Sequence, residues 1–491
     1  MDTPLLCATV TAATMAGLTE ARDRASVVAD LVELRLDGVA DLDVQGALAG
    51  RRGPVIVTCR PVREGGRFDG AEDERLEVLD RAAALGAEYV DLEWDSAHMP
   101  LVARRGGRGV IVSSHDFDGV PADLPARFAA MRATGAEVVK IAVTAHRLAD
   151  NLPLLALGRE SVGHGRVALV AMGDAGLPSR VLAARFGSCW TYSGDAVAPG
   201  QVTPERMVSE FRIRALTATS RVFGLVGRPV GHSVSPAMHN AAFDATGVDA
   251  VYLPFAARDM ADFRAFAEAM GVAGASVTAP FKTDALREAG EADEPARRCG
   301  AANTLLMAAG GRWTARNADI DGFLDPIDAR GIALRGIRCA VVGAGGAARA
   351  VVVALAQRGA LVTVYGRREE GARQVAGLAD GGVARVGIPS AGSFDLLVNA
   401  TPVGMWPAVD AAPVEPAVLS RGDIVYDLVY NPQRTALLRQ AEAAGCVAIS
   451  GLEMLIAQAA RQFEWWTGTK APREVMRAAA VERLQRMAGE A

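Results

Sequence analysis

The stretch Val138-Val139-Lys140-Ile141-Ala142-Val143 is a short apolar run with one cation inside it, and runs of this kind decide the fold of the first half. They recur about every 25 residues and alternate with segments of helical character. Eight strands alternating with helices predict an α/β fold, a (β/α)8 TIM barrel, whose active site lies at the carboxyl ends of the strands. The candidate strands are Leu5–Thr9, Leu31–Leu36, Val55–Cys59, Tyr89–Leu92, Val110–Ser113, Val138–Val143, Val167–Ala171 and Cys189–Tyr192.

Lys140 lies inside an apolar strand, where an unpaired cation is costly to bury. We therefore expect an acidic partner, or a shift toward the neutral amine, which is a nucleophile. A purely structural ion pair is the alternative. Polar residues that could share the site lie in or after other candidate strands, as a barrel would place them. They are Glu33, Arg35, Arg60, His115 and Arg180.

Lys140 and His115 fit two roles in the activation of a ketone. A lysine can condense with the ketone, because the protonated imine draws electrons and acidifies the neighbouring carbon. A nearby histidine can then remove the proton from that carbon.

The first half resembles the type I 3-dehydroquinate dehydratases over nearly all of residues 1–215, with that family's motifs in order. The motifs are Glu33-Leu34-Arg35-Leu36-Asp37, Thr58-Cys59-Arg60 followed by Glu64-Gly65-Gly66, Ser114-His115-Asp116-Phe117, Val139-Lys140-Ile141-Ala142, Met172-Gly173 through Ser179-Arg180, and Ala198-Pro199-Gly200-Gln201. Val197 stands where the family usually has serine, which predicts the loss of a carboxylate or lid contact.

This resemblance implies a Schiff-base dehydration that needs no metal. Lys140 would form the imine with the C3 ketone of 3-dehydroquinate. His115, oriented by Glu64, would remove the C2 proton and protonate the departing C1 hydroxyl, giving 3-dehydroshikimate. The implied substrate-binding residues are Glu33, Arg35 and Arg60 for the ring hydroxyls, and Arg180 and Gln201 for the carboxylate.

The pattern changes near Thr217 to Arg221, and we place a short linker there. Val222–Val226 begins a new strand, and a second alternating series predicts a second α/β lobe. The strands of that series are Cys339–Val342, Leu361–Tyr365, Leu396–Asn399 and Ile424–Asp427.

A glycine-rich turn, Gly343-Ala344-Gly345-Gly346-Ala347-Ala348, lies between a strand and a helix expected over 347–358, and it fits the dinucleotide fingerprint. A turn without nucleotide is the alternative. About 20 residues further on, where an NAD-specific fold has an acidic residue, the sequence reads Tyr365-Gly366-Arg367-Arg368. Two arginines suit the 2′-phosphate of NADP, unless they are simply exposed charges.

The second half resembles the shikimate dehydrogenases from Arg221 to Ala491. The motifs are Gly227-Arg228-Pro229-Val230-Gly231-His232-Ser233-Val234-Ser235-Pro236 followed by His239-Asn240, Val277-Thr278-Ala279-Pro280-Phe281-Lys282, Gly300-Ala301-Ala302-Asn303-Thr304, Asn317-Ala318-Asp319, Asn399-Ala400-Thr401-Pro402 and Gly404-Met405. Ser276, Ala318 and Gly366 depart from the family's asparagine, threonine and asparagine.

This second resemblance implies NADPH-dependent reduction of the C3 carbonyl, with Lys282 and Asp319 as catalytic residues. Outside a substrate pocket the same two residues would be an ordinary salt bridge. The implied substrate-binding residues are Ser233, Ser235, Thr278, Asn303, Tyr430 and Gln458. The expected cofactor-binding residues are Gly343, Ala344, Gly345, Gly346, Ala347, Arg367, Arg368, Asn399, Thr401 and Gly451.

The expected domains are a barrel over 1–217, a substrate-binding lobe over 221–325 completed by helices in 452–491, and an NADP-binding lobe over 326–451. The two reactions would be consecutive, since the product of the first is the substrate of the second. Quinate dehydrogenation in the second half, or a non-catalytic metabolite sensor, are the alternatives. The pair Ser233 and Ser235 favours shikimate over quinate.

The composition is that of a globular chain of 491 residues, 50% hydrophobic, and about 150 residues per domain gives roughly three domains. A net charge of -5 offers no basic field for nucleic acid or an anionic membrane. The six cysteines have no C-x-x-C spacing, so we expect buried free thiols. No signal peptide or run of about 18 apolar residues is evident, which predicts a cytoplasmic protein.

Overall fold

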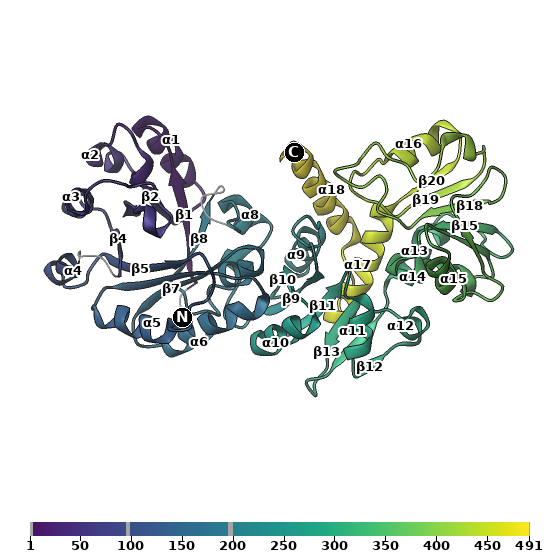
Figure 1. The fold of residues 1–491 in the computed structure, drawn as a ribbon, viewed down its shortest axis with the longest axis horizontal. Helices are drawn as coiled ribbons and strands as arrows, with labels where there is room; N and C mark the ends of the chain where they lie inside the picture. The colour runs from purple at the N-terminus through teal and green to yellow at the C-terminus, as the bar shows by residue number, and fades with distance from the viewer. Residues whose placement is uncertain (1–2, 95–98, 195–199, 491) are drawn as a thin grey trace. The chain divides into compact units, whose positions relative to one another are not determined.

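A computed structural model describes residues 3–94, 99–194 and 200–490 (Figure 1). Val197, Ala198 and Pro199 lie outside the described residues. Contacts divide the chain into two compact units. Unit 1 comprises Met1–Arg221 and Asp249–Gly271, and unit 2 comprises Val222–Val248 and Val272–Ala491.

Unit 1 contains an eight-stranded parallel sheet with the order β7-β6-β5-β4-β3-β2-β1-β8. A parallel bridge between Val167 and Ser188 joins its two ends, so the sheet is a nearly closed barrel. All eight expected strands are confirmed: their amino-terminal ends agree to within one residue, and their carboxyl-terminal ends differ by one to three residues. They are β1 (Leu5–Thr11), β2 (Leu31–Arg35), β3 (Val55–Thr58), β4 (Tyr89–Glu93), β5 (Val110–Asp116), β6 (Val138–Thr144), β7 (Arg166–Met172) and β8 (Trp190–Gly194).

Helices alternate with these strands, as Figure 1 shows. Side chains of Thr14, Asp43 and Thr203 accept backbone N–H groups at the starts of three of them, which satisfies otherwise unpaired donors. The helices are α1 (Met15–Ala25), α2 (Val44–Leu48), α3 (Glu72–Ala84), α4 (Met99–Arg105), α5 (Leu124–Ala133), α6 (Leu152–Glu160), α7 (Leu177–Val181) and α8 (Pro204–Ser209), with short 3-10 turns η1 (Leu36–Gly38), η2 (Val62–Glu64), η3 (Leu148–Asn151), η4 (Asp174–Gly176) and η5 (Ile213–Ala215).

The barrel interior changes from apolar to polar toward the carboxyl ends of the strands. An apolar cluster that includes Leu31, Val138 and Trp190 fills the amino-terminal part. Further along, strand β6 contributes Lys140, and Glu33 of β2, Asp91 of β4 and Tyr192 of β8 each contact this lysine. A layer of four side chains from alternate strands is how such barrels are filled, and here that layer is polar.

The second half contains two six-stranded sheets with the orders β10-β9-β11-β13-β14-β12 and β17-β16-β15-β18-β19-β20. The first mixes parallel and antiparallel pairs, whereas the second is parallel throughout. The expected strands are confirmed. The strands are β9 (Arg221–Gly227), β10 (Ala250–Ala256), β11 (Val272–Val277), β12 (Glu291–Ala292), β13 (Thr304–Met307), β14 (Trp313–Arg316), β15 (Arg338–Val342), β16 (Leu361–Gly366), β17 (Val383–Val386), β18 (Leu396–Asn399), β19 (Ile424–Asp427) and β20 (Val447–Ser450).

Apolar clusters on the second of these sheets form the core around it. The expected helix over 347–358 is α14, and α17 and α18 occupy the stretch 452–491 in which helices were expected. Helix α17 packs on α13 and contacts β11. The helices are α9 (Ser235–Thr246), α10 (Met260–Met270), α11 (Lys282–Glu288), α12 (Glu294–Cys299), α13 (Asp319–Asp328), α14 (Gly346–Gln357), α15 (Glu369–Ala376), α16 (Ala436–Ala443), α17 (Gly451–Thr467) and α18 (Arg473–Glu490), with the 3-10 turn η6 (Pro416–Val418).

The six cysteines are free thiols, as expected, but only four of them are buried. Cys189 and Cys446 are half-buried, which corrects the expectation that all would be inside. None of the helices within the described residues has both the length and the apolar character needed to cross a membrane. The domain bounds given above stay a prediction.

Candidate active sites

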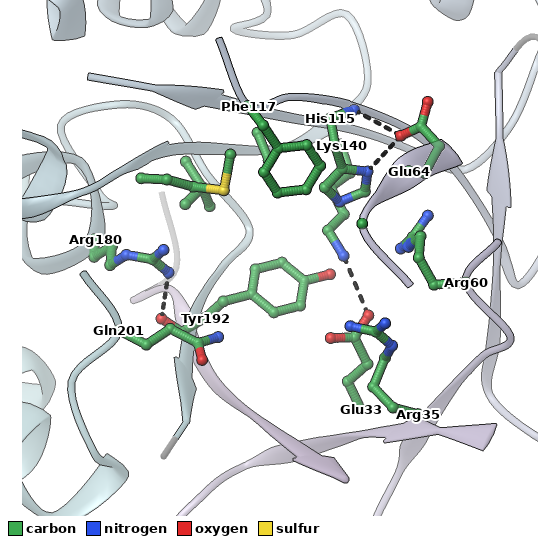
Figure 2. Close-up of a pocket in the computed structure, with 14 residues that line it drawn as sticks. Glu33, Arg35, Arg60, Glu64, His115, Phe117, Lys140, Arg180, Tyr192 and Gln201 are labelled. Atoms are coloured by element: carbon green, nitrogen blue, oxygen red, sulfur yellow. Dashed lines mark hydrogen bonds and ion pairs between the residues drawn. The ribbon is translucent and has the colours of Figure 1, made fainter. Parts of the chain in front are cut away.

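The carboxyl ends of the barrel strands surround a pocket that brings together every site residue predicted in the first half (Figure 2). The residues that line this pocket are far apart in the sequence, from Glu33 to Gln201. The lining residues are Glu33, Arg35, Arg60, Glu64, Gly65, His115, Phe117, Lys140, Ala142, Val170, Met172, Arg180, Tyr192 and Gln201.

Lys140 is buried and paired with acidic residues, which is one of the two outcomes expected from the sequence. Its Nζ lies 3.0 Å from Asp91 Oδ2 and 3.2 Å from Glu33 Oε1, and 4.1 Å from the centre of the Tyr192 ring. Burial by itself would raise the pKa of both carboxyls. The positive charges of Lys140 and Arg60 outweigh burial and hold the pKa of Glu33 and of Asp91 below the usual range.

Asp91 and Glu93 are functional residues that the sequence reading missed. They lie two residues apart on β4, so both side chains point into the barrel, and both are fully buried. Two acidic residues at this spacing in a short strand are the sequence feature that could have identified them as part of the site.

Arg60 binds those two acids. Its guanidinium donates to Glu93 at 2.7 Å and Ser113 at 2.8 Å and lies 3.0 Å from Asp91. Burial opposes the charge of Arg60, but Asp91 and Glu93 outweigh it and raise its pKa. Arg75, also buried, lies 2.5 Å from Glu93. The structure therefore gives Arg60 acidic partners in addition to its place in the pocket lining.

His115 is held in one orientation by Glu64. Glu64 Oε2 lies 3.0 Å from both the backbone nitrogen and Nδ1 of His115. Burial, together with the positive charges of Arg60 and Lys140, lowers the pKa of His115 well below its usual value. The imidazole is therefore neutral at neutral pH. A carboxylate can only accept, so Nδ1 carries the proton and Nε2 is left as a base.

Arg180 is a buried cation without an acidic partner among the described residues. Its Nη1 donates to the carbonyl oxygen of Tyr192 at 3.1 Å, and its Nε has no hydrogen-bond partner within the described chain. Burial lowers its pKa to about 10. A guanidinium in this state is suited to a bidentate bond with an incoming carboxylate.

Unit 2 contains a second and larger pocket, with a cavity of about 670 Å³. All predicted substrate-binding and catalytic residues of the second half line it. These residues are Ser233, Ser235, Thr278, Lys282, Asn303, Asp319, Tyr430 and Gln458, and Ala347, Thr401 and Gly451 of the predicted cofactor set line it as well.

Lys282 and Asp319 are in direct contact in this pocket, with Nζ 2.6 Å from Oδ2. The other carboxylate oxygen of Asp319 accepts a bond of 2.8 Å from Asn303, which also donates to Gln458 at 3.3 Å. Because Asp319 has both oxygens occupied, it fixes the ammonium group of Lys282. An ammonium group has three donors, so Lys282 can still donate to a substrate oxygen.

The residues that depart from the family pattern keep ordered surroundings. Ser276 donates to Gln462 at 2.7 Å, and the backbone nitrogen of Ala318 donates to Asn303 at 2.7 Å. A Cβ added at Gly366 would lie 3.2 Å from Ala372, so a larger residue there would need a small shift.

The remaining predicted cofactor residues lie at the carboxyl ends of β15, β16 and β18, as in a dinucleotide-binding fold. Gly343 has a φ of 118°, and a Cβ there would come within 2.8 Å of the Ala400 oxygen, so this turn requires glycine. The backbone continues through Ala344 and Gly345 to the start of α14 at Gly346.

Two arginines and an asparagine are the last residues of the predicted cofactor set to be placed. Arg367 and Arg368 follow β16 and are exposed. Asn399 is buried and has a supporting role: it donates to Asp427 at 2.9 Å and accepts from Thr401. The glycine turn, the helix start and the exposed arginines fit a dinucleotide that carries a 2′-phosphate.

Fold and sites together define the class: an α/β barrel with a buried lysine, joined to a two-lobed dinucleotide-binding protein. Family models agree. Residues 6–217 match the type I 3-dehydroquinase model, residues 225–305 the shikimate dehydrogenase substrate binding domain, and residues 451–481 the shikimate 5'-dehydrogenase C-terminal domain.

Relatives extend this agreement over nearly the whole chain. A chloroplastic bifunctional 3-dehydroquinate dehydratase/shikimate dehydrogenase of Arabidopsis thaliana is 34% identical over 91% of this chain and 79% of its own length. A shikimate dehydrogenase (NADP(+)) of Methanosarcina mazei is 42% identical over 54% of this chain and 99% of its own. A solved shikimate dehydrogenase in complex with NADP+ superposes with a TM-score of 0.53 at 33% identity, covering 55% of this chain and 97% of that one.

The chain therefore belongs to the family of bifunctional 3-dehydroquinate dehydratase/shikimate dehydrogenases. It is both a lyase and an NADP-dependent oxidoreductase of the shikimate pathway.

Proposed function

We propose that the barrel pocket dehydrates 3-dehydroquinate through an imine on Lys140, and that the unit 2 pocket reduces 3-dehydroshikimate with the aid of Lys282 and Asp319. The observation that carries the first part is the buried Lys140, 3.0 Å from Asp91, in one pocket with a neutral His115.

Glu33 and Asp91 keep Lys140 in place and compensate its charge while it is an ammonium. The amine becomes nucleophilic once that proton has left, and these two carboxylates are the bases in contact with it. Attack on the C3 ketone and loss of water give the iminium, which again carries a positive charge at Nζ. Glu33, Asp91 and the Tyr192 ring stabilise that charge as they stabilise the ammonium.

His115 then acts as the base and the acid. Nε2 takes the C2 proton, and the imidazolium that results is stabilised by Glu64 across the 3.0 Å contact to Nδ1. The same proton is returned to the C1 hydroxyl, which leaves as water. Hydrolysis of the imine releases 3-dehydroshikimate and restores the amine of Lys140.

The substrate carboxylate is held at the opposite side of the pocket by Arg180 and Gln201 (Figure 2). A carboxylate there supplies a counter-charge that the described residues do not give Arg180. Arg35, which is held by Asp37 through two bonds of 2.8 Å, lines the same pocket and is directed at the ring hydroxyls in this proposal.

In unit 2, NADPH supplies a hydride to the C3 carbonyl carbon when it is bound. Lys282 protonates the carbonyl oxygen and takes a proton back from solvent, and Asp319 compensates the charge of the lysine ammonium group. Ser233 and Ser235 donate to the substrate carboxylate, and Tyr430 lies in the same pocket. Arg367 and Arg368 bind the 2′-phosphate and give the preference for NADP over NAD.

The partners in this proposal are small acids, and no nucleic acid is among them, in accord with the net charge of -5. We propose the cytoplasm as the compartment. The plant relative is described as chloroplastic, so fractionation of the native host, with the two activities as markers, is the direct test.

The chain itself offers a sharp test, because it has three lysines: Lys140, Lys282 and the exposed Lys470. Purified protein is mixed with 3-dehydroquinate and NADPH, and enone absorbance and NADPH loss are followed. Lys140→Ala should stop the reaction before the enone, and Lys282→Ala after it, while Lys470→Ala should match the wild type. Quinate with NADP+ is the control for the alternative activity.

Borohydride added with 3-dehydroquinate should attach the substrate to Lys140 alone, measured as one modified peptide by mass spectrometry. An adduct on Lys282 or Lys470, or enone formation by Lys140→Ala at the wild-type rate, would reject the imine mechanism on Lys140. NADPH loss by Lys282→Ala at the wild-type rate would reject the role given to that lysine.

A further inference from the structure

Unit 1 includes a segment that lies far from the barrel in sequence. Asp249–Gly271, which contains β10 and α10, belongs to the same compact unit as the barrel. It falls inside the stretch that matches the shikimate dehydrogenase substrate binding domain. In unit 1, α10 packs against η3, and β10 contacts η4 and α7. These three barrel elements follow the strands β6 and β7 at their carboxyl ends, where the dehydratase pocket lies.

Asp262 of α10 makes hydrogen bonds across the contact between α10 and η3. Its side chain is buried, with 5% of the residue exposed. Oδ2 accepts the backbone N–H of Leu148 at 3.1 Å and that of Arg258 at 2.9 Å, and Oδ1 accepts the N–H of Ala149 at 2.9 Å. The carboxylate therefore caps the amino-terminal end of η3 from outside the barrel sequence, where N–H groups otherwise have no partner.

Asn151, the last residue of η3, continues the connection. Its Nδ2 donates to the carbonyl oxygen of Leu148 at 2.9 Å and to that of Ala175 at 2.8 Å. The second bond joins η3 to η4. Asn151 is fully buried, so a change in the position of η3 would leave polar groups without partners or move η4 with it.

The chain of contacts ends at Arg180. Ser179 of α7 donates to the Gly176 oxygen of η4 at 2.9 Å and accepts the N–H of Ala171 in β7 at 2.8 Å. Arg180, the next residue of α7, lines the dehydratase pocket and donates to the Tyr192 oxygen. The position of η3 is thus linked by buried hydrogen bonds to the residue that faces the substrate carboxylate.

We propose that Asp262, a residue of the dehydrogenase half, is a positioning residue of the dehydratase: it fixes η3 and through Asn151 and η4 the place of Arg180. This inference rests on the proposed function of the barrel pocket. Arg180 holds the carboxylate equally in the ground state and in the transition state. A misplaced Arg180 should therefore weaken substrate binding and leave the chemical step nearly unchanged.

The test uses the full chain with Asp262→Ala and Asp262→Asn, and steady-state kinetics of both activities. The dehydratase KM for 3-dehydroquinate should rise about tenfold in Asp262→Ala, and less in Asp262→Asn, which keeps one acceptor. The dehydratase kcat should stay within about twofold. Asn151→Ala should raise the same KM, and the double variant should be less than additive, because both residues act through one connection.

Asp259→Ala is the matched control. Asp259 caps α10 itself by accepting the N–H of Asp262 at 2.8 Å, and its own side chain is about half exposed. Loss of this cap should destabilise α10, as Asp262→Ala does, and leave the dehydratase KM unchanged. Shikimate oxidation by NADP+ serves as the internal control in every variant.

The possible results distinguish a failure of the inference on Asp262 from a failure of the proposed dehydratase function. An Asp262→Ala chain with wild-type KM overturns this inference, and so does a loss of kcat without a rise in KM, or an equal rise of the dehydratase KM in Asp259→Ala. If Asp262→Ala is poorly folded by thermal unfolding, Asp262→Asn and Asn151→Ala decide in the same way. A wild-type chain that fails to dehydrate 3-dehydroquinate would remove the proposed function, and this inference with it.

Discussion

Two buried cations in the barrel, Lys140 and Arg180, have opposite surroundings. Lys140 lies between Glu33 and Asp91, so its charge is compensated in the free protein. Arg180 has no acidic partner among the described residues, and burial lowers its pKa to about 10. A buried charge without a counter-ion is costly, and a bound carboxylate removes that cost. In the proposed reaction one cation is therefore the reactive group and the other is the anchor.

The same pocket predicts an unusual pH dependence of the dehydratase. His115 acts as a base when it is neutral, and burial together with Arg60 and Lys140 holds its pKa well below the usual value. The dehydratase activity that depends on neutral His115 is present above the pKa of His115 in the folded protein, and it is lost as the pH falls through that pKa. The logarithm of kcat/KM should therefore stay flat through pH 6.5 and fall only at clearly lower pH.

Glu64→Gln provides the comparison for that profile. The amide cannot stabilise the imidazolium as the carboxylate does, so kcat should fall by roughly 100-fold. The measurement is enone formation across the pH range, with NADP-dependent shikimate oxidation as the control. An acid limb centred near pH 6.5 in the wild type, or a Glu64→Gln chain at full rate, would contradict the assignment.

At the scale of elements, the predicted site residues lie at or near the carboxyl ends of strands. The strands β2, β4, β6 and β8 carry one polar layer of the barrel, and the residues that we predict to bind the cofactor follow β15, β16 and β18. Parallel strands bring their carboxyl ends to one side, so residues far apart in sequence meet there. In β16 the strand end places Arg367 and Arg368 in solvent, free to meet an anionic ligand.

The end of β16 should set the choice between the two nicotinamide cofactors. In Arg367→Ala and Arg368→Ala the KM for NADPH should rise by roughly 10- to 100-fold, the worth of a charge-assisted hydrogen bond of about 1.5–3 kcal/mol. The KM for NADH should change little, because it has no 2′-phosphate. Arg373→Ala, an exposed arginine of the next helix paired with Glu369, is the matched control. Equal effects on both cofactors would refute the assignment.

At the scale of the whole molecule, each pocket is lined from within one unit. Among the residues that the structure describes, those that line the barrel pocket belong to unit 1, and those that line the second pocket belong to unit 2. The two activities should therefore be separable by mutation even though one chain carries both.

A mixture of Lys140→Ala and Lys282→Ala chains tests this separation. Neither variant alone should convert 3-dehydroquinate to shikimate, but an equimolar mixture should, since the intermediate can diffuse between chains. NADPH loss should begin after a lag that shortens as the protein concentration rises. If each variant keeps its remaining activity and the mixture still makes no shikimate, the sites are not independent.

The sequence by itself determined the elements and most members of both sites. Eight apolar runs predicted the eight barrel strands, because strand and helix periods are local properties of the chain. The positions just after those runs predicted pocket residues such as His115 and Arg180, because every parallel strand delivers its end to the same face. Motif resemblance supplied the lysine and aspartate of the second pocket, which the structure brings into contact.

Only the tertiary structure decided which groups are partners. Lys140 and Asp91 are 49 residues apart, and their pairing depends on the register of the strands between them, which no local pattern specifies. The pairing of Arg60 with Asp91 and Glu93 depends on packing in the same way, and so does the cap that Asp262 places on η3. Packing also leaves Arg180 without an acidic partner among the described residues. Periodicity fixes which face a side chain takes, whereas its charge partner is fixed only when distant segments pack together.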